Sequence, residues 1–398
     1  MGEKRVGASQ QSSRRWWTGV LALAIMLAAW SASGCRAEQQ GWPLWDAYAQ
    51  RFVDVQGRVI DHSAADHTTS EGQAYGLFFA LVANDRARFD KMLGWTETNL
   101  ASGDLTLHLP SWNWGKNAAG EWKTLDPSSA TDADLWLAYT LLEAGRLWQE
   151  PRYAKLGQML VSRIAQQEVV EVPNFGTTLM AGPSGFHPDA KTWITNPSYF
   201  PLPVLTYLAV TMPKGPWSMV KTSFPSLVTG GTSSGYAMDW VAVTASGLKP
   251  VVSSAMQGSH TEKPVGSYDA IRVYLWAGIS DPATPGLKQL FGQLGGMSGY
   301  MRGALTPPLE VDATGKVLQA DSPPGFSAAV IPFLESLGMK EQAKVQADRL
   351  AATRDTGTGL YGHGVDYYDQ NLALFSVGWS EGRYRFDRDG RLQLKWKR

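Results

Sequence analysis

Residues 132–148 read DADLWLAYTLLEAGRLW, and after a short break residues 151–166 read PRYAKLGQMLVSRIAQ. The first segment is rich in apolar side chains around the whole helix circumference. The second has apolar residues at helical spacing on one side and charged or polar residues on the other. A helix that is apolar all round is enclosed by protein, whereas an amphipathic helix lies at the surface. The two segments therefore predict a buried helix followed by a surface helix.

The same contrast recurs along the chain. Residues 71–83 are apolar on every face and 86–100 are amphipathic, and the contrast returns between 325–336 and 339–353. The predicted helices lie near residues 42–54, 71–84, 86–100, 132–148, 151–167, 199–212, 215–229, 270–279, 284–299, 325–336, 339–353 and 366–378. Helices that alternate between buried and exposed predict a mainly α fold, an (α/α)6 barrel in which six helical hairpins form an inner ring within an outer one.

Short strand signals lie between the helices. Alternating stretches around a Gly turn occur at residues 53–60, 309–318 and 384–396, and each predicts a small β-hairpin. In the last of them Tyr384, Phe386, Leu392, Leu394 and Trp396 would share one apolar face. The remaining connections, at 101–129, 168–198 and 231–268, are long and rich in Gly, Pro, Ser and Thr. Connections of that length often form binding sites.

Residues 1–37 are predicted to be a signal peptide. Arg14 and Arg15 precede an apolar run from Trp16 to Trp30, which is followed by small residues. The run is shorter than the roughly 20 residues of a membrane span. Residues 38–398 are then a single domain of a periplasmic or secreted protein. Two fates of Cys35 stay open, a lipid anchor at a lipobox-like Ala-Ser-Gly-Cys sequence or ordinary cleavage near Ala37.

Composition excludes several function classes. The chain has 36 Lys+Arg and 36 Asp+Glu, and removal of residues 1–37 leaves 31 basic and 35 acidic residues, a net charge of −4. Nucleic acid is not an expected partner, because binding phosphates needs a surplus of basic residues. One Cys and six scattered His offer no spaced zinc ligands, so no metal and no cofactor are expected. Tryptophan is abundant, with 17 residues that suit either core packing or flat contacts to a neutral sugar.

Three of the buried helices begin with acidic residues: Glu71, then Asp132 and Asp134, and then Asp269. A Ser lies one to three residues before the first acidic residue of each group, so each start taken alone could be a capping box stabilised by the helix dipole. If the helices line the inside of a barrel, however, their N-termini converge at one mouth. Convergent carboxylates beside aromatic residues suit glycosidic bond hydrolysis, which needs one protonated acid and one ionised carboxylate.

A family resemblance becomes specific at this point. Residues 130–148, ATDADLWLAYTLLEAGRLW, resemble the signature of family 8 glycoside hydrolases, inverting endoglucanases with an (α/α)6 barrel. Leu137 and Thr140 depart from the usual pattern at packing positions. Residues 69–76, 196–199 and 268–272 also resemble family blocks, so the resemblance spans most of the chain after the leader. Within the family the chain is similar to the periplasmic endoglucanases associated with bacterial cellulose synthesis.

The resemblance implies roles for individual residues. It implies Glu71 as the general acid, Asp269 as the general base and Asp132 as the residue that holds the distorted sugar. The implied substrate contacts are Trp114, Asp134, Tyr199, Tyr268 and Arg272. The implied partner is a β-1,4-glucan chain, which a monomeric enzyme would bind either alone or docked on a cellulose synthase complex.

The acid role of Glu71 conflicts with its position, because a helix N-terminus favours the ionised form of a carboxyl. We expect burial and the neighbouring carboxylates of Asp132 and Asp134 to oppose the dipole, and Arg272 to be the charge partner of Asp269. Proton transfer and attack by water would then occur on opposite faces of the sugar.

Other interpretations compete with this one. Gly231–Gly235 matches the GxSxG pattern of serine hydrolases, but that pattern requires a strand before the serine and a helix after it. A non-catalytic glucan-binding protein on the same barrel is a second alternative. Xylan, chitosan and mixed-linkage glucan are alternative substrates for the fold, and the charge of −4 gives no strong attraction for cationic chitosan.

Overall fold

The computed structural model describes residues 1–2, 41–252 and 263–397. Nearly all of the predicted signal peptide, including Cys35, lies outside the described residues, so these predictions remain untested. Residues Trp42–Arg398 form one compact unit. Within the described residues, no helix has the length and apolar character needed to cross a membrane.

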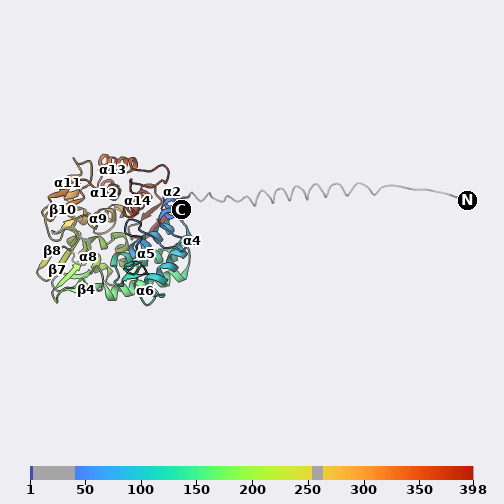
Figure 1. Ribbon diagram of the computed structural model, residues 1–398, viewed down its shortest axis with the longest axis horizontal. Helices are drawn as coiled ribbons and strands as arrows, with labels where there is room; N and C mark the ends of the chain where they lie inside the picture. Colours follow the sequence, from blue (N-terminus) through green and yellow to red (C-terminus); the bar gives the residue numbers. More distant parts are fainter. Residues whose placement is uncertain (3–40, 253–262, 398) are drawn as a thin grey trace. The chain divides into compact units, whose positions relative to one another are not determined.

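Six helices form the inner ring of the fold. They are α3 (Ser70–Val82), α5 (Thr131–Leu147), α7 (Leu202–Thr211), α9 (Ala270–Ile279), α12 (Pro324–Ser336) and α14 (Tyr367–Ser380). These are the segments whose apolar residues cover the whole helix, and α3, α5 and α9 are buried along almost their entire length. In Figure 1, α5, α9, α12 and α14 lie toward the middle of the ribbon, whereas α4, α6 and α13 lie at its rim.

The outer helices pack against the inner helices that precede them in the chain. They are α4 (Arg86–Leu100), α6 (Pro151–Gln167), α8 (Trp217–Leu227), α10 (Leu287–Gln293) with α11 (Gly295–Tyr300), and α13 (Lys340–Ala352). The sixth outer position is filled by α2 (Pro43–Phe52), which packs against α14. The amphipathic α6 is an example of such an outer helix, since it buries one face, with Tyr153, Leu156, Leu160 and Ile164 at helical spacing. The predicted (α/α)6 barrel is confirmed.

Aromatic side chains fill the centre of the inner ring. Phe375 of α14 lies 5.0 Å from Trp276, 5.1 Å from Trp136 and 5.3 Å from Phe78, measured between ring centroids. Tyr75 packs edge-on against the same Phe375 at 5.1 Å. Edge-to-face contacts of this kind add to the free energy gained by burying large apolar rings. Trp136 and Trp276 therefore pack in the core. These aromatic rings fill the interior of the inner ring.

One glycine marks a close approach between the backbones of two inner helices. A Cβ atom on Gly278 of α9 would lie 2.2 Å from the backbone N of Phe333 in α12. The two inner helices can pack this closely only because Gly278 has no side chain.

Small antiparallel sheets occupy the connections. They are β1 (Thr68–Thr69) with β2 (Asn113–Lys116) and β3 (Trp122–Asp126); β4 (Val169–Val172) with β5 (Gly176–Leu179); β6 (Thr192–Thr195) with β7 (Val241–Thr244) and β8 (Gly247–Pro250); β9 (Val265–Gly266) with β10 (Glu310–Asp312) and β11 (Val317–Gln319); and β12 (Tyr384–Phe386) with β13 (Leu392–Leu394). The predicted hairpins at 309–318 and 384–396 are confirmed, and Tyr384 pairs with Leu394 as the shared face requires.

Three details differ from the sequence-based predictions. The hairpin expected at 53–60 is reduced to a single bridge between Val53 and Val59. The helix expected at 284–299 is divided into α10 and α11 at Leu294, where two glycines follow. The connections 101–129, 168–198 and 231–268 contain the hairpin strands of three sheets, so they are less irregular than expected.

Candidate active site

The N-terminus of α3 places Glu71 in its first helical turn. The cap is Thr69, whose Oγ1 accepts a hydrogen bond from the backbone N of Gly72 at 3.1 Å. The alternative interpretation, a capping box with Ser70 as the cap, is therefore wrong for α3, because Ser70 is already the first helical residue. Since Thr69 caps the helix, the Glu71 carboxylate is free for other contacts.

The N-termini of α5 and α9 also leave their carboxylates free. The cap residue of α5 is Ala130, which has no capping side chain, and the preceding Ser129 bonds Glu168 instead. Asp132 Oδ1 accepts a hydrogen bond from the backbone N of the next residue, Ala133, at 2.8 Å. Asp269 occupies the cap position of α9, yet its side chain makes no capping hydrogen bond. The capping-box interpretation therefore explains none of these acidic side chains.

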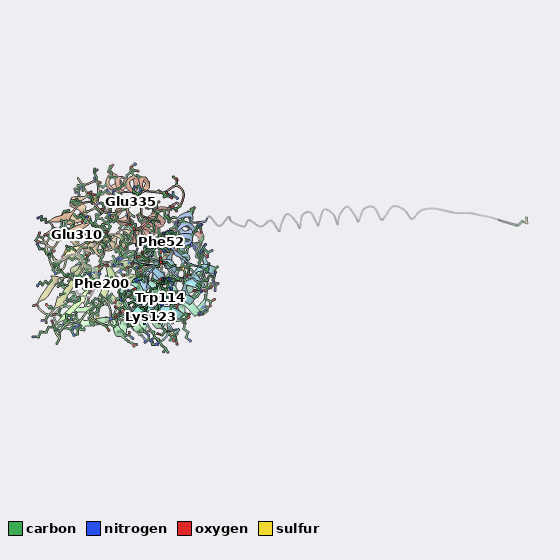
Figure 2. The ribbon with its side chains drawn as sticks, viewed as in Figure 1. Phe52, Trp114, Lys123, Phe200, Glu310 and Glu335 are labelled. Atoms are coloured by element: carbon green, nitrogen blue, oxygen red, sulfur yellow. The ribbon has the colours of Figure 1, made fainter. Side chains whose placement is uncertain are left out.

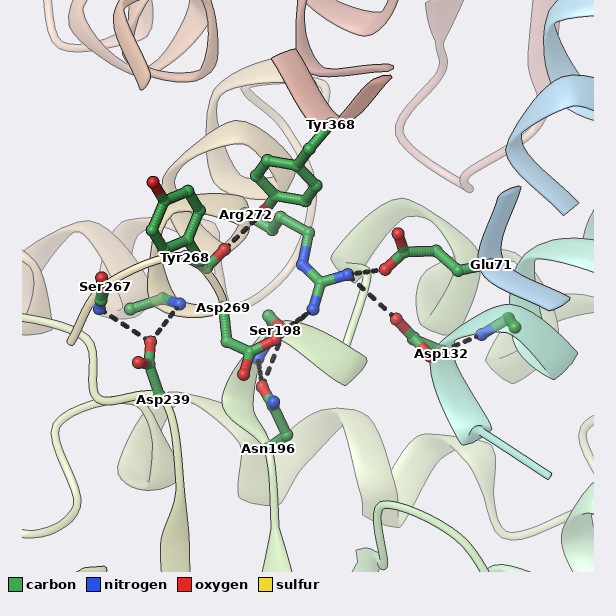
Figure 3. A network of polar contacts seen from close by, with 12 residues as sticks. Glu71, Asp132, Asn196, Ser198, Asp239, Ser267, Tyr268, Asp269, Arg272 and Tyr368 are labelled. Carbon is green, nitrogen blue, oxygen red and sulfur yellow. Dashed lines mark hydrogen bonds and ion pairs between the residues drawn. The ribbon is translucent and has the colours of Figure 1, made fainter. Parts of the chain in front are cut away.

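Arg272 brings the three carboxylates together, as Figure 3 shows. Its Nη1 contacts Glu71 Oε2 and, at 3.1 Å, Asp132 Oδ2. Its Nη2 donates to Asp269 Oδ1 at 2.5 Å and to Ser198 Oγ at 3.0 Å. One guanidinium thus lies between Glu71 and Asp269, which approach it from helices far apart in the sequence. The predicted convergence of the acidic helix starts, and the pairing of Arg272 with Asp269, are both present.

The three carboxyls differ in burial. The side chains of Glu71 and Asp269 are 21% and 15% exposed, whereas those of Asp132 and Arg272 are 3% and 4% exposed. Burial, with a smaller contribution from the charge of Glu71, raises the pKa of Asp132 to about 8. Burial also raises the pKa of Asp269, against the opposing effect of Arg272. Only the outer two carboxyls therefore meet solvent, while Asp132 lies beneath them and binds a proton more tightly than an ordinary aspartate.

Tyrosines surround this cluster. The ring of Tyr199 lies 5.7 Å from the Arg272 guanidinium carbon. Tyr268 is 51% exposed and packs edge-on against Phe326. Its backbone oxygen accepts a hydrogen bond from the hydroxyl of Tyr368 at 2.5 Å. Tyr199 and Tyr268 therefore lie beside the acidic cluster, and their role as substrate contacts stays a prediction.

Asp134 does not join the cluster. Its carboxyl is fully buried against Glu168, whose Oε1 accepts a hydrogen bond from Ser129 Oγ at 2.8 Å. Burial and the adjacent Glu168 raise the pKa of Asp134 well above its ordinary range, and burial raises the pKa of Glu168 to about 7. Two neighbouring carboxyls in a buried site oppose each other's ionisation. The expected influence of Asp134 on Glu71 is therefore replaced by a pairing with Glu168.

Trp114 lies on the β2–β3 hairpin, where Figure 2 labels it beside Lys123. Its ring stacks on Trp122 at 5.1 Å with an interplanar angle of 12°, and it packs edge-on against Trp95. The guanidinium of Arg58 lies 4.5 Å from the same ring. Much of the Trp114 ring is therefore occupied by protein, and its role as a sugar contact remains a prediction.

Several residues of the site were missed by the sequence analysis. The Tyr75 hydroxyl and Ser198 contact Arg272, and Asp239 accepts hydrogen bonds from the backbone at the start of α9. Tyr75 and Ser198 stand inside the sequence blocks 69–76 and 196–199, so those blocks were a usable signal. Asp239 had no such signal, because its partners are 28 and 31 residues away.

The GxSxG match does not form a nucleophile elbow. Residues 231–235 lie in turns between α8 and β7, with a helix rather than a strand before them. Among the residues that the structure describes, no group of three or more His, Cys, Asp or Glu side chains is arranged to hold a metal ion. The chemistry that this arrangement does offer is a pair of solvent-reaching carboxyls with a third, more deeply buried carboxyl of raised pKa beside them.

Comparisons with known proteins agree with this arrangement. Residues 17–382 match the family described as glycosyl hydrolases family 8. The chain is 41% identical to an endoglucanase of Xanthomonas axonopodis pv. citri (strain 306), over 95% of this chain and 94% of that protein. It is 39% identical to an endoglucanase of Escherichia coli (strain K12), over 94% and 95% of the two chains.

A solved structure is similar along the same length. The crystal structure of an endo-1,4-D-glucanase from Vibrio fischeri ES114 has a TM-score of 0.78 and 38% sequence identity, covering 90% of this chain and 100% of that one. The chain therefore belongs to glycoside hydrolase family 8. It is an enzyme that hydrolyses glycosidic bonds, as the convergent carboxyls led us to expect.

Proposed function

We propose that this chain hydrolyses internal bonds of a β-1,4-glucan with inversion at the anomeric carbon. The activity is that of an endo-1,4-β-glucanase, in line with the endoglucanases to which the chain is similar over most of its length. The observation that carries the proposal is the single guanidinium of Arg272, which holds Glu71, Asp132 and Asp269 together from three separate helices.

Glu71 is the general acid and Asp269 the general base. Both side chains reach solvent, and they contact different nitrogens of Arg272, so the width of the guanidinium keeps them apart. Inversion needs such a separation, because a water molecule must fit between the base and the sugar. Asp269 removes a proton from this water as it attacks the anomeric carbon, while Glu71 protonates the leaving oxygen.

The charge count supports retention of protons in this site. Three carboxyls surround one guanidinium, so full ionisation would leave an excess of two negative charges in a partly desolvated space. Asp132, with its pKa raised to about 8 by burial, keeps one proton at neutral pH. The Asp132 carboxyl lies beside Glu71 at the base of the site. This position suits a hydrogen bond to a sugar hydroxyl at the cleavage point.

Product stereochemistry tests the mechanism. Proton NMR of the first product from a cello-oligosaccharide should show the α-anomer before mutarotation. The Asp269→Asn variant should keep its fold and lose nearly all turnover. An initial β-anomer, or an active Asp269→Asn enzyme, would contradict the assignment.

Substrate choice is tested on a panel. Carboxymethylcellulose and mixed-linkage glucan, xylan and chitosan should be compared for reducing ends released and for the fall in viscosity. An endo-acting glucanase lowers viscosity early, while few reducing ends have formed. Faster hydrolysis of xylan or chitosan would replace the β-1,4-glucan proposal, and binding without cleavage would favour the non-catalytic alternative.

The cellular setting is also a proposal. The leader-like residues 1–37 favour a periplasmic or secreted enzyme that acts as a monomer on glucan near the cellulose synthase complex. Mass spectrometry of the mature N-terminus, compared with a Cys35→Ala variant, distinguishes a lipid anchor on Cys35 from cleavage near Ala37. Co-purification with synthase subunits tests docking, and light scattering tests the monomer.

A further inference from the structure

The start of α9 satisfies its backbone N–H groups in an unusual way. Asp is a favoured N-cap residue because its carboxylate accepts the N–H of the second or third helical residue. Asp269 holds that position in α9, but its side chain makes no capping bond and extends to Arg272 instead, at 2.5 Å. Another group must therefore satisfy the first amides of the helix.

Asp239 does so from a separate segment. Its Oδ1 accepts hydrogen bonds from the backbone N of Ser267 at 2.8 Å and of Ala270 at 2.7 Å. The next two amides of the helix, those of Ile271 and Arg272, bond to backbone carbonyls at 3.0 and 3.1 Å. Figure 3 shows the Asp239 carboxyl beneath the turn, with both bonds drawn.

The two backbone amides that donate hydrogen bonds to Asp239, those of Ser267 and Ala270, lie on either side of Tyr268 and Asp269. One carboxyl oxygen thus bridges the turn that carries the general base. We propose that Asp239 is a positioning residue for Asp269: by capping α9 from another loop, it keeps the Asp269 carboxylate turned toward Arg272 and the reacting water.

Asp239 is itself held in place. Its backbone N donates to the carbonyl of Val265 at 2.9 Å, and the next residue, Trp240, is buried and followed directly by β7. The side chain is therefore a fixed acceptor aimed at the helix start. Without it, the amides of Ser267 and Ala270 lose their acceptor, and the Asp269 carboxylate is a nearby group that could turn inward to replace it.

The cap needs an oxygen rather than a charge. Burial and then the charge of Asp269 raise the pKa of Asp239 to about 8, so the neutral acid is the main form at neutral pH. Asn carries the same acceptor oxygen without ionising, and it is as good an N-cap as Asp. Asp239→Asn is thus the conservative variant that should restore what Asp239→Ala removes.

The inference rests on the proposed role of Asp269, and the experiment separates the two. The steady-state kcat and KM for a cello-oligosaccharide, together with the midpoint of thermal unfolding, are measured for Asp239→Ala, Asp239→Asn and Asp269→Asn. The matched control is Asp85→Ala, because Asp85 caps the outer helix α4 through the backbone N of Arg88 at 3.1 Å.

We expect Asp239→Ala to lower kcat at least tenfold with KM within twofold, and Asp239→Asn to keep at least half of the kcat of the unmodified enzyme. Asp85→Ala should lose thermal stability with kcat unchanged. If Asp239→Ala loses only stability, as the control does, or if Asp239→Asn is as impaired as Asp239→Ala, the positioning role is wrong. If Asp269→Asn stays active, the base assignment itself is wrong, whatever the Asp239 variants do.

Discussion

Replacing Asp132 by Asn should change how the stability of the protein depends on pH. The Asp132 side chain is 3% exposed, and burial raises its pKa to about 8. In the unfolded chain the same carboxyl titrates near the ordinary value of about 3.9. Between these two values the native state binds a proton that the unfolded state has released. Stability therefore falls as pH rises through this window, and Asn, which does not titrate, removes that dependence.

The size of the effect follows from the width of the window. One proton held only by the native state costs about 1.4 kcal/mol for each pH unit. From pH 5 to pH 8 the stability lost through this one proton is therefore at most about 4 kcal/mol. Coupling of Asp132 to its neighbours through Arg272 reduces this loss. We expect the gap between the unfolding free energies of the two proteins to shift by about 2 to 4 kcal/mol in favour of Asp132→Asn.

The assay is urea unfolding of both proteins at pH 5, 6.5 and 8. Other buried carboxyls with raised pKa values, such as Glu168 and Asp369, destabilise both proteins alike at high pH, so the difference isolates Asp132. Equal loss of stability by the two proteins across this range would refute the reasoning, because it would mean that Asp132 is already ionised at pH 5.

Four further outcomes are expected. Glu71→Gln should lower kcat by about 10³-fold or more with little change in substrate binding, which isothermal titration with a cello-oligosaccharide can check against the kinetics. Arg272→Met should cost about 3–5 kcal/mol at pH 7, because it leaves buried carboxyls without their counter-charge, and less at pH 5, where they can take up protons. Asp134→Leu should cost about 2–3 kcal/mol by removing the polar neighbour of the buried Glu168 carboxyl, whereas Asp134→Asn should cost less than about 1 kcal/mol, both measured by urea unfolding. Gly278→Ala should cost about 1–3 kcal/mol and lower the thermal midpoint, because the new Cβ meets the backbone of α12; a stability equal to that of the unmodified protein would show that the helices can separate freely.

The helical framework was predictable because the helices are long and strongly patterned. In α5 and α6 the change from apolar on all faces to apolar on one face is visible over 17 residues each. The strands are only two to five residues long, which leaves little room for an alternating pattern. β8 reads GLKP and could not be recognised as a strand from its sequence. Its place in a sheet depends on pairing with β7, a contact that local sequence does not encode.

The site was predictable where the fold alone brings residues together. Once the inner helices are placed, Glu71, Asp132 and Asp269 must meet at one end of the barrel. Asp134 was misplaced because residues two apart on a helix project from nearly opposite sides, so it could not face the same centre as Asp132. Asp239 was missed because the backbone amides that donate hydrogen bonds to it belong to a distant segment of the sequence.

The position of α2 against α14 also bears on how the chain matures. The Tyr48 hydroxyl bonds Asn371 across 323 residues of sequence, and Trp396 bonds the backbone of Leu81 across 315. Contacts of such separation cannot form until synthesis of the chain is nearly complete, and they slow folding. A nascent chain that lacks its last helix has an open ring with exposed apolar faces. In the proposed periplasmic or secreted setting such a delay would be useful, because a polypeptide that cannot complete its fold early stays unfolded long enough to pass through a secretion channel.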